Sequence, residues 1–220
     1  MQYFQRGKFM YKVLVVDDQL TAQQIISDTI EESEEFILFK IIDNASLAEM
    51  CCLSGDIDLI IMDVYTAHGE NGIRAASKIK TDFPNIKIII VTSMAECSFI
   101  EKAKQANCDS FWYKDMGEKK LLEVMQDTMK GKKIWPQKLP QVKIGNIKST
   151  QFTVRELEVL REIVNGVPNK EICKKLYITK STLDTHIRNM LVKTGYTSKI
   201  KLAVDVASKE LIIPDFWNEI

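Results

Sequence analysis

Five short runs of mostly apolar residues, rich in β-branched or aromatic side chains, recur through the first half of this 220-residue chain. They are apolar almost throughout rather than alternating with polar residues. This is typical of parallel strands that are buried on both faces of a sheet. The runs are KVLVV (12–16), ILFKII (37–42), DLIIM (58–62), KIIIV (87–91) and SFWY (110–113).

Segments of helical length or spacing separate these runs. Strands that alternate with helices predict an α/β domain whose five-stranded parallel sheet is doubly wound, with ligands bound beyond the carboxyl ends of the strands. The expected helices lie near residues 21–33, 46–53, 71–82, 95–106 and 117–130.

The pattern changes after Lys130, where prolines, glycines and scattered lysines replace any periodicity. We therefore assign residues 131–148 to a linker. Only helical patterns follow, beginning with a capping box in which Thr153 precedes Glu156 by three residues. Four compact helices, with a tight turn between the second and third, predict a small all-α helix-turn-helix domain over residues 149–214.

The formal net charge of zero conceals a division along the chain. Residues 11–129 carry 11 Lys and Arg against 21 Asp and Glu. Residues 130–150 carry six Lys and no acid, and residues 151–209 carry 11 basic against six acidic side chains. An acidic half beside a basic half predicts that only the second half binds a polyanion.

The sequence also indicates the cellular compartment of the protein. The longest apolar runs are far shorter than the roughly 20 residues that a membrane span requires, and no secretory signal is evident at the start. We therefore expect a cytoplasmic protein with no membrane partner. Its five cysteines are odd in number and lack CxxC spacing, which favours reduced thiols over a disulfide framework or a zinc site.

Chemically active side chains follow the predicted strands. Asp17 and Asp18 follow the first run, Asp63 the third, Thr92 the fourth and Lys114 the fifth. The carboxyl ends of parallel strands meet at one edge, so we expect these side chains to converge. Carboxylates on neighbouring strands supply the hard oxygen ligands that an octahedral Mg²⁺ prefers, and such an ion can also take a phosphoryl oxygen.

The motifs VVDD, IIMD, VTSM and FWYKD resemble the receiver domain of bacterial two-component response regulators over residues 11–130. The resemblance implies a flavodoxin-like sheet, with Asp63 accepting a phosphoryl group from a sensor histidine kinase. It also implies that Lys114 contacts the phosphoryl oxygens. The implied ligands of Mg²⁺ are Asp17, Asp18, Asp63 and the backbone carbonyl of Tyr65.

The resemblance further implies that Thr92 and Phe111 form the family's switch pair, in which the hydroxyl moves to the phosphoryl group and the aromatic ring repacks. The loop after Asp63, VYTAHGENG, departs from the family pattern because it lacks the usual proline and is one residue longer. Tyr65 in this loop leads to the hypothesis that its side chain shields the aspartyl phosphate from water.

The segment FTVREL to VKTGY resembles the LuxR-type helix-turn-helix of the NarL/FixJ response regulators, with TxREL, NG, NKEI and IT in order. Together, the two resemblances imply a regulator of transcription, not an enzyme. Phosphorylation would then control dimerisation and sequence-specific binding to double-stranded DNA.

In the stretch ITKSTLDTHIRNML, one helical stripe contains Leu183, Ile187, Met190 and Leu191 and is expected to face the core. The opposite face is expected to enter the major groove, while the lysines contact phosphates. The predicted DNA-binding residues are Lys170, Lys180, Ser181, Thr182, Asp184, Thr185, Arg188, Asn189 and Lys193.

Asp184 stands where the LuxR-type pattern usually has lysine. It lies four residues from both Lys180 and Arg188, a spacing suited to ion pairs, so it could orient Arg188. Alternatively, its carboxylate accepts a hydrogen bond from a cytosine amino group. The sequence leaves both roles open.

Two other functions compete with this interpretation. A Mg²⁺-dependent phosphohydrolase could use Asp63 as nucleophile on a similar sheet. However, Tyr65 stands two residues later, where a second carboxylate would be needed, and the helix-turn-helix would be unexplained. A regulator that responds to a protein partner or to concentration, without phosphorylation, is the other alternative.

Overall fold

The computed structural model describes residues 4–5, 8–54, 56–67, 70–96, 98–114 and 119–214. The chain forms two compact units. The first comprises Met1–Ser93 and Ser98–Gln137, and the second Met94–Cys97 and Lys138–Ile220. In the described residues, no helix is both long and apolar enough to cross a membrane.

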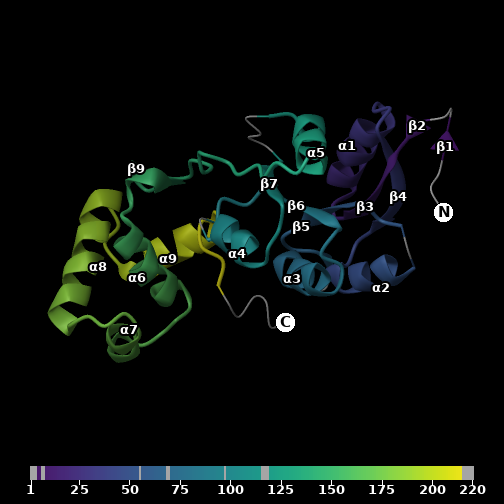
Figure 1. The fold of residues 1–220 in the computed structure, drawn as a ribbon. Helices are drawn as coiled ribbons and strands as arrows, with labels where there is room; N and C mark the ends of the chain where they lie inside the picture. Colours follow the sequence, from purple (N-terminus) through teal and green to yellow (C-terminus); the bar gives the residue numbers. More distant parts are fainter. Residues whose placement is uncertain are drawn as a thin grey trace. The chain divides into compact units, whose positions relative to one another are not determined.

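A five-stranded parallel sheet forms the centre of the first unit (Figure 1), with strand order β4-β3-β5-β6-β7. This is the predicted doubly wound arrangement. A short hairpin of β1 (Phe4–Gln5) and β2 (Lys8–Phe9) precedes it. The sheet strands are β3 (Tyr11–Val16), β4 (Phe36–Ile42), β5 (Leu59–Asp63), β6 (Lys87–Thr92) and β7 (Ser110–Tyr113).

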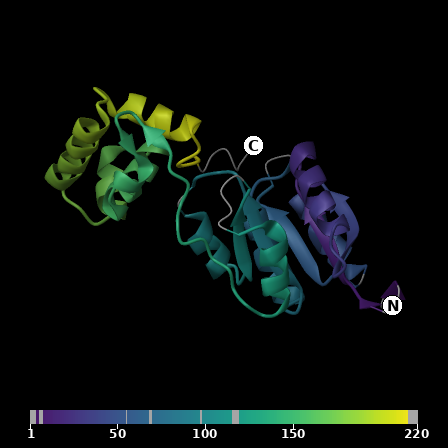
Figure 2. The ribbon, with the colours of Figure 1, turned by 90° about the horizontal axis from the view of Figure 1, so that it is seen from above.

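Helices cover both faces of this sheet: α1 packs beside α5, whereas α2, α3 and α4 pack in turn on the other side (Figures 1 and 2). The fourth helix begins at Phe99, which is later than predicted. Residues 94–96, at the start of the predicted helix, are not helical. The elements are α1 (Leu20–Glu31), the 3-10 turn η1 (Ala45–Leu47), α2 (Ala48–Leu53), α3 (Gly72–Asp82), α4 (Phe99–Gln105) and α5 (Leu121–Met129).

The strands are buried on both faces, which explains their almost wholly apolar sequences. Val13 and Val15 of β3 point to the layer of α1 and α5, where they meet Ile26 and Val124. Residues on the opposite face of the same strand, such as Leu14, are also fully buried. Described cysteines 51, 52, 108 and 173 are free thiols, and Cys97 lies outside the described residues.

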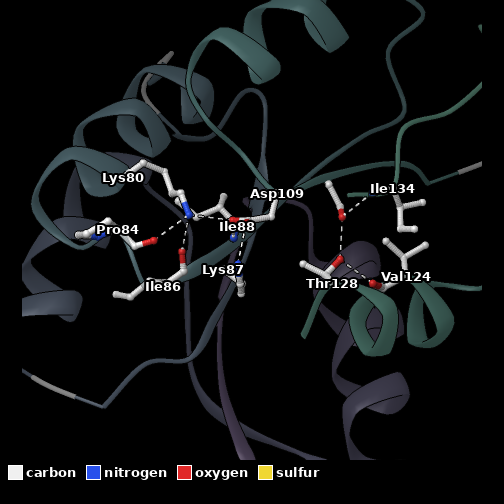
Figure 3. Close-up of polar contacts among 10 residues, drawn as sticks. Lys80, Pro84, Ile86, Lys87, Ile88, Asp109, Val124, Thr128 and Ile134 are labelled. Carbon is white, nitrogen blue, oxygen red and sulfur yellow. Dashed lines mark hydrogen bonds and ion pairs between the residues drawn. The ribbon is translucent and has the colours of Figure 1, made fainter. Parts of the chain in front are cut away.

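A buried ion-pair network joins the strand ends opposite the predicted site (Figure 3). Asp109 accepts hydrogen bonds from Lys80 Nζ at 2.9 Å, Lys87 Nζ at 3.0 Å and the backbone N–H of Ile88 at 3.0 Å. Burial raises the pKa of Asp109, but these hydrogen bonds outweigh it, so the pKa lies below the ordinary value. The network fixes the start of β7 against β6.

The chain after α5 returns to the edge of this sheet. The backbone N–H of Phe111 donates to the carbonyl of Ile134 at 2.8 Å, and Ile134 N–H donates to Ser110 Oγ at 3.1 Å. Ser110 Oγ lies 2.7 Å from Thr128 Oγ1 of α5. Thr128 and Ile134 are labelled on the right of Figure 3. The first part of the predicted linker is therefore bonded to β7.

Four helices form the second unit, in agreement with the predicted all-α domain. Their core also contains Ile144 and Ile147, which belong to a hairpin within the predicted linker. Strands of two residues show no periodicity, so the sequence pattern could not reveal them. The elements are β8 (Lys143–Ile144), β9 (Ile147–Lys148), η3 (Ser149–Gln151), α6 (Val154–Val164), α7 (Asn169–Lys175), α8 (Lys180–Thr194) and α9 (Lys199–Ser208).

Candidate functional site

Three carboxylates meet at the carboxyl edge of the sheet, as predicted. Asp17 directly follows β3, Asp18 comes next, and Asp63 is the last residue of β5. One oxygen of each lies within 4.8 Å of the others. Asp17 and Asp63 are buried, whereas Asp18 is exposed. The parallel pairing of β3 with β5 brings these residues together.

Lys114, the residue after β7, reaches into this cluster. Its Nζ lies 2.7 Å from Asp17 Oδ2 and 2.7 Å from Asp63 Oδ2. The backbone N–H of Lys114 donates to the carbonyl of Thr92 at 2.9 Å, which fixes its position beside the end of β6. The cation therefore bridges the two buried acids.

The electrostatic balance at Asp63 favours protonation more than at an exposed aspartate. Burial raises the pKa of Asp63 to about 6, Lys114 opposes this shift, and Asp17 adds to it. The Val64 N–H also opposes it by donating to Asp63 Oδ1 at 2.7 Å. A bound cation would favour the ionised carboxylate further.

The donor set fits a metal site. Three carboxylates offer hard oxygen ligands, and the exposed position of Asp18 leaves one side of the cluster open to solvent. Buried carboxylates at this spacing repel one another unless cations compensate them.

The two predicted switch residues lie on adjacent strands. Thr92 ends β6 and is buried at the edge that carries the acids. Phe111 is buried within β7, and its ring centroid lies 5.0 Å from that of Tyr113. The strand register pairs Thr92 with Tyr113, so Phe111 lies farther down the sheet than Thr92.

The long loop after Asp63 is hydrogen-bonded to the start of the 3-10 turn η1. Thr66 is buried, and its Oγ1 accepts from the backbone N–H of Ala45 at 2.9 Å. The ring of Tyr65 packs edge-on against Phe99 of α4, with centroids 5.8 Å apart. His68 and Gly69, in the middle of this loop, lie outside the described residues.

Gly72 is a site residue that the sequence analysis missed. Its N–H donates to the carbonyl of Val64 at 2.8 Å, and a Cβ at this position would overlap the carbonyl oxygen of Asp63. The glycine therefore lets the start of α3 approach the backbone of Asp63. The Asn71–Gly72 pair that precedes a helical pattern was the available signal.

On the second unit, α8 presents the face that was predicted to be exposed. Leu183 and Met190 are buried in the core, with Ile187 and Leu191 packed against it. The Thr179 side chain caps the helix by accepting from Thr182 N–H at 3.2 Å. The predicted contact residues that are exposed are Lys170, Lys180, Ser181, Thr182, Asp184, Thr185, Arg188 and Asn189.

The start of α6 holds both ends of α8. Arg155 donates to the carbonyl of Leu176, in the turn before α8. The buried carboxylate of Glu156 pairs with Lys193 in the last turn of α8, at 2.8 Å. Lys193, which was predicted to bind phosphate, therefore already has an anionic partner in its own domain.

Asp184 shows neither of its suggested ion pairs. Among the described residues, its carboxylate makes no ion pair with Lys180 or Arg188 within 4.0 Å, although the spacing permits one. Asp184 and Arg188 both line an open hollow of about 380 Å³ on α8. The orienting contact is thus absent from this structure.

Each half of the chain matches the model of a known protein family. The model of the response regulator receiver domain matches residues 13–126, and that of bacterial regulatory proteins of the luxR family matches residues 150–206. The chain therefore belongs to the response regulators that carry a receiver and a LuxR-type DNA-binding domain, which are transcription regulators rather than enzymes.

Relatives span nearly the whole chain. The transcriptional regulatory protein LnrK of Bacillus subtilis is 23% identical over 89% of this chain and 96% of its own length. The response regulator protein VraR of Staphylococcus aureus is 28% identical over 91% of this chain and 98% of its own length. RcsB from Salmonella enterica serovar Typhimurium, solved on promoter rprA with the phosphomimetic BeF3-, shares the fold. Its TM-score is 0.59 at 21% identity, over 90% of this chain and 98% of that one.

Proposed function

We propose that phosphorylation of Asp63 by a sensor histidine kinase controls how the second unit binds double-stranded DNA. The observation that carries this proposal is the buried Asp63 carboxylate at the end of β5, with Lys114 Nζ 2.7 Å away. We place this activity in the cytoplasm.

In the proposed transfer, an oxygen of Asp63 attacks the phosphorus of the kinase's phosphohistidine. The N–P bond breaks as an O–P bond forms, and an acyl phosphate results. Lys114 is placed to hold a phosphoryl oxygen, because it already contacts Asp63. Asp17, Asp18, Asp63 and the backbone carbonyl of Tyr65 would hold Mg²⁺, which supplies positive charge to the phosphoryl group.

The response would then pass through Thr92 and Phe111. A phosphoryl group on Asp63 offers oxygens that accept a hydrogen bond from the Thr92 hydroxyl, and movement there gives Phe111 room to repack. The backbone of Phe111 is bonded to Ile134, so such repacking acts on the segment that leaves the sheet.

DNA binding is assigned to α8. The helix is long enough to lie in the major groove, and its exposed face carries Ser181, Thr185, Arg188 and Asn189 as hydrogen-bonding groups. Lys170 and Lys180 are exposed and suit phosphate contacts. Lys193 is already ion-paired with Glu156, so it would have to contact a phosphate and this carboxylate together. The solved structure of two RcsB dimers bound to two parallel DNAs supports the same use of this fold.

We assign dimerisation of the second unit to a hollow of about 550 Å³ between α6 and α9. Ile200 and Val204 of α9 line it, and both side chains are exposed although they are apolar. A second copy that covers this surface would place two α8 helices on two half-sites. Two weak half-site contacts then act together.

The proposal is tested by treating the chain with a small-molecule phosphodonor and Mg²⁺. A mass gain of one phosphoryl group that Asp63→Asn abolishes, together with tighter DNA binding, supports the proposal. Unchanged DNA binding after confirmed phosphorylation would favour a regulator that ignores phosphorylation. Turnover of many equivalents of a phosphomonoester would favour the phosphohydrolase.

A further inference from the structure

Val192 occupies the outward face of α8, and its side chain is 78% exposed. It follows Arg188 by four residues and Thr185 by seven, so the three side chains share one face of the helix. Leu183 and Met190, on the opposite side, make the contacts with the core. Core packing therefore does not explain an apolar residue at position 192.

The surroundings of Val192 are partly apolar. It lines the hollow of about 380 Å³ on α8 together with Leu191 and Tyr196, and the polar side chains of Asp184 and Arg188 border the same hollow. Beside the proposed hydrogen-bonding residues, α8 thus carries an aliphatic surface that can exclude water from a partner group.

The major groove of DNA offers one prominent apolar feature, the 5-methyl group of thymine. The proposed DNA-binding half of the chain is basic, which favours a polyanion over a neutral partner at this face. Valine has no charge to attract phosphate, so its contribution would be to sequence reading and not to general affinity.

We propose that Val192 contacts the methyl group of a thymine and thereby selects an A·T pair in each half-site. This inference rests on the proposed DNA binding by α8. The four-residue interval from Arg188 corresponds to roughly 6 Å along the helix axis. The thymine is therefore expected within about two base-pair steps of the base contacted by Arg188.

The test uses the full chain and a DNA site chosen by in vitro selection. Each thymine of the site is replaced singly by uracil, which lacks the methyl group but keeps the same hydrogen-bonding groups. For the wild type, replacement at one position of each half-site should weaken binding about fourfold, as expected for the loss of one buried methyl group.

In Val192→Ala, thymine and uracil at that position should bind equally, while the salt dependence stays as in the wild type. Val154→Ala is the matched control, because Val154 is a 75% exposed valine on α6, and it should keep the wild-type preference for thymine. Binding to the thymine-containing site should weaken for Val192→Ala and not for Val154→Ala.

Two outcomes would overturn the inference, and they differ in their meaning for the proposed function. If the chain selects a site but Val192→Ala retains the full thymine preference at every position, Val192 does not read thymine, although DNA binding stands. If the chain selects no sequence under either phosphorylation condition, both proposals fail.

Discussion

The backbone N–H of Phe111 donates to the carbonyl of Ile134 over 2.8 Å, so the proposed switch residue is bonded directly to the segment that follows the receiver's last helix. The next hydrogen bond along this edge runs from Ile134 N–H to Ser110 Oγ at 3.1 Å. These two hydrogen bonds couple Ile134 to β7.

Ser110→Ala tests this coupling. The variant removes the acceptor for Ile134 N–H but leaves Asp63 and its neighbours intact, so phosphorylation of Asp63 should proceed as in the wild type. The increase in DNA affinity on phosphorylation should become smaller, as measured by titration with and without phosphodonor. Thr29→Ala, which removes an exposed hydroxyl from α1, should keep the full increase. An unchanged increase in Ser110→Ala would exclude this route.

Asp109→Asn tests the buried ion-pair network. The variant leaves Lys80 and Lys87 without their carboxylate partner, and the free energy of unfolding should fall by about 3 kcal/mol at neutral pH. Urea unfolding of the full chain measures this change. Asp127→Asn, which disrupts a more exposed pair with Lys119 and Lys132, should have a much smaller effect.

The pH dependence of this effect has a defined sign. The folded-state pKa of Asp109 lies below its ordinary value, so its stabilising contribution is present above the unfolded-state pKa of about 3.9. The contribution is lost as pH falls through the folded-state pKa. The stability difference between wild type and Asp109→Asn should therefore be constant near neutral pH and shrink below about pH 4. A difference that grows on acidification would contradict the assignment.

Asp184→Lys tests whether this acid reads a base pair. The structure shows no ion pair between Asp184 and Arg188, so replacement by lysine should mainly add a positive charge near the phosphates. General DNA affinity should rise, and the dependence of binding on salt should steepen by about one unit in the logarithmic plot. A selective loss at a single C·G pair, without a steeper salt dependence, would instead show direct reading by the carboxylate.

Tyr65→Ala should shorten the half-life of the aspartyl phosphate. The ring lies two residues after Asp63 and packs against Phe99, where it can limit the access of water. Tyr65→Phe keeps the ring and should keep the half-life. Release of inorganic phosphate from the purified phosphorylated chain measures both, and equal half-lives in all three proteins would exclude shielding.

The sequence predicted the sheet and its acidic edge because strong local signals carry both. Buried parallel strands must be apolar, and residues that end such strands, such as Asp63, must share one edge. Contacts that depend on a close approach gave weaker signals. Gly72 could be placed against Asp63 only once α3 was in position, and Thr66 shows its anchoring role only through its bond to Ala45.

The second unit shows the same limits. The four helices follow from periodicity and capping, but a hairpin with two-residue strands around Gly145 has no period to detect. A lysine such as Lys193 looks free in a sequence, and only the fold brings it to Glu156. Val192 was missed because a valine near a core stripe resembles a buried residue until its exposure is known.

The most direct test of the central claim is a titration of one DNA site by the wild type and by Asp63→Asn, each with and without phosphodonor and Mg²⁺. The phosphodonor should tighten binding by the wild type at least tenfold, a coupling of about 1.4 kcal/mol, and leave Asp63→Asn unchanged. Equal tightening in both proteins, or none in a wild-type sample that mass spectrometry shows to be phosphorylated on Asp63, would contradict the account.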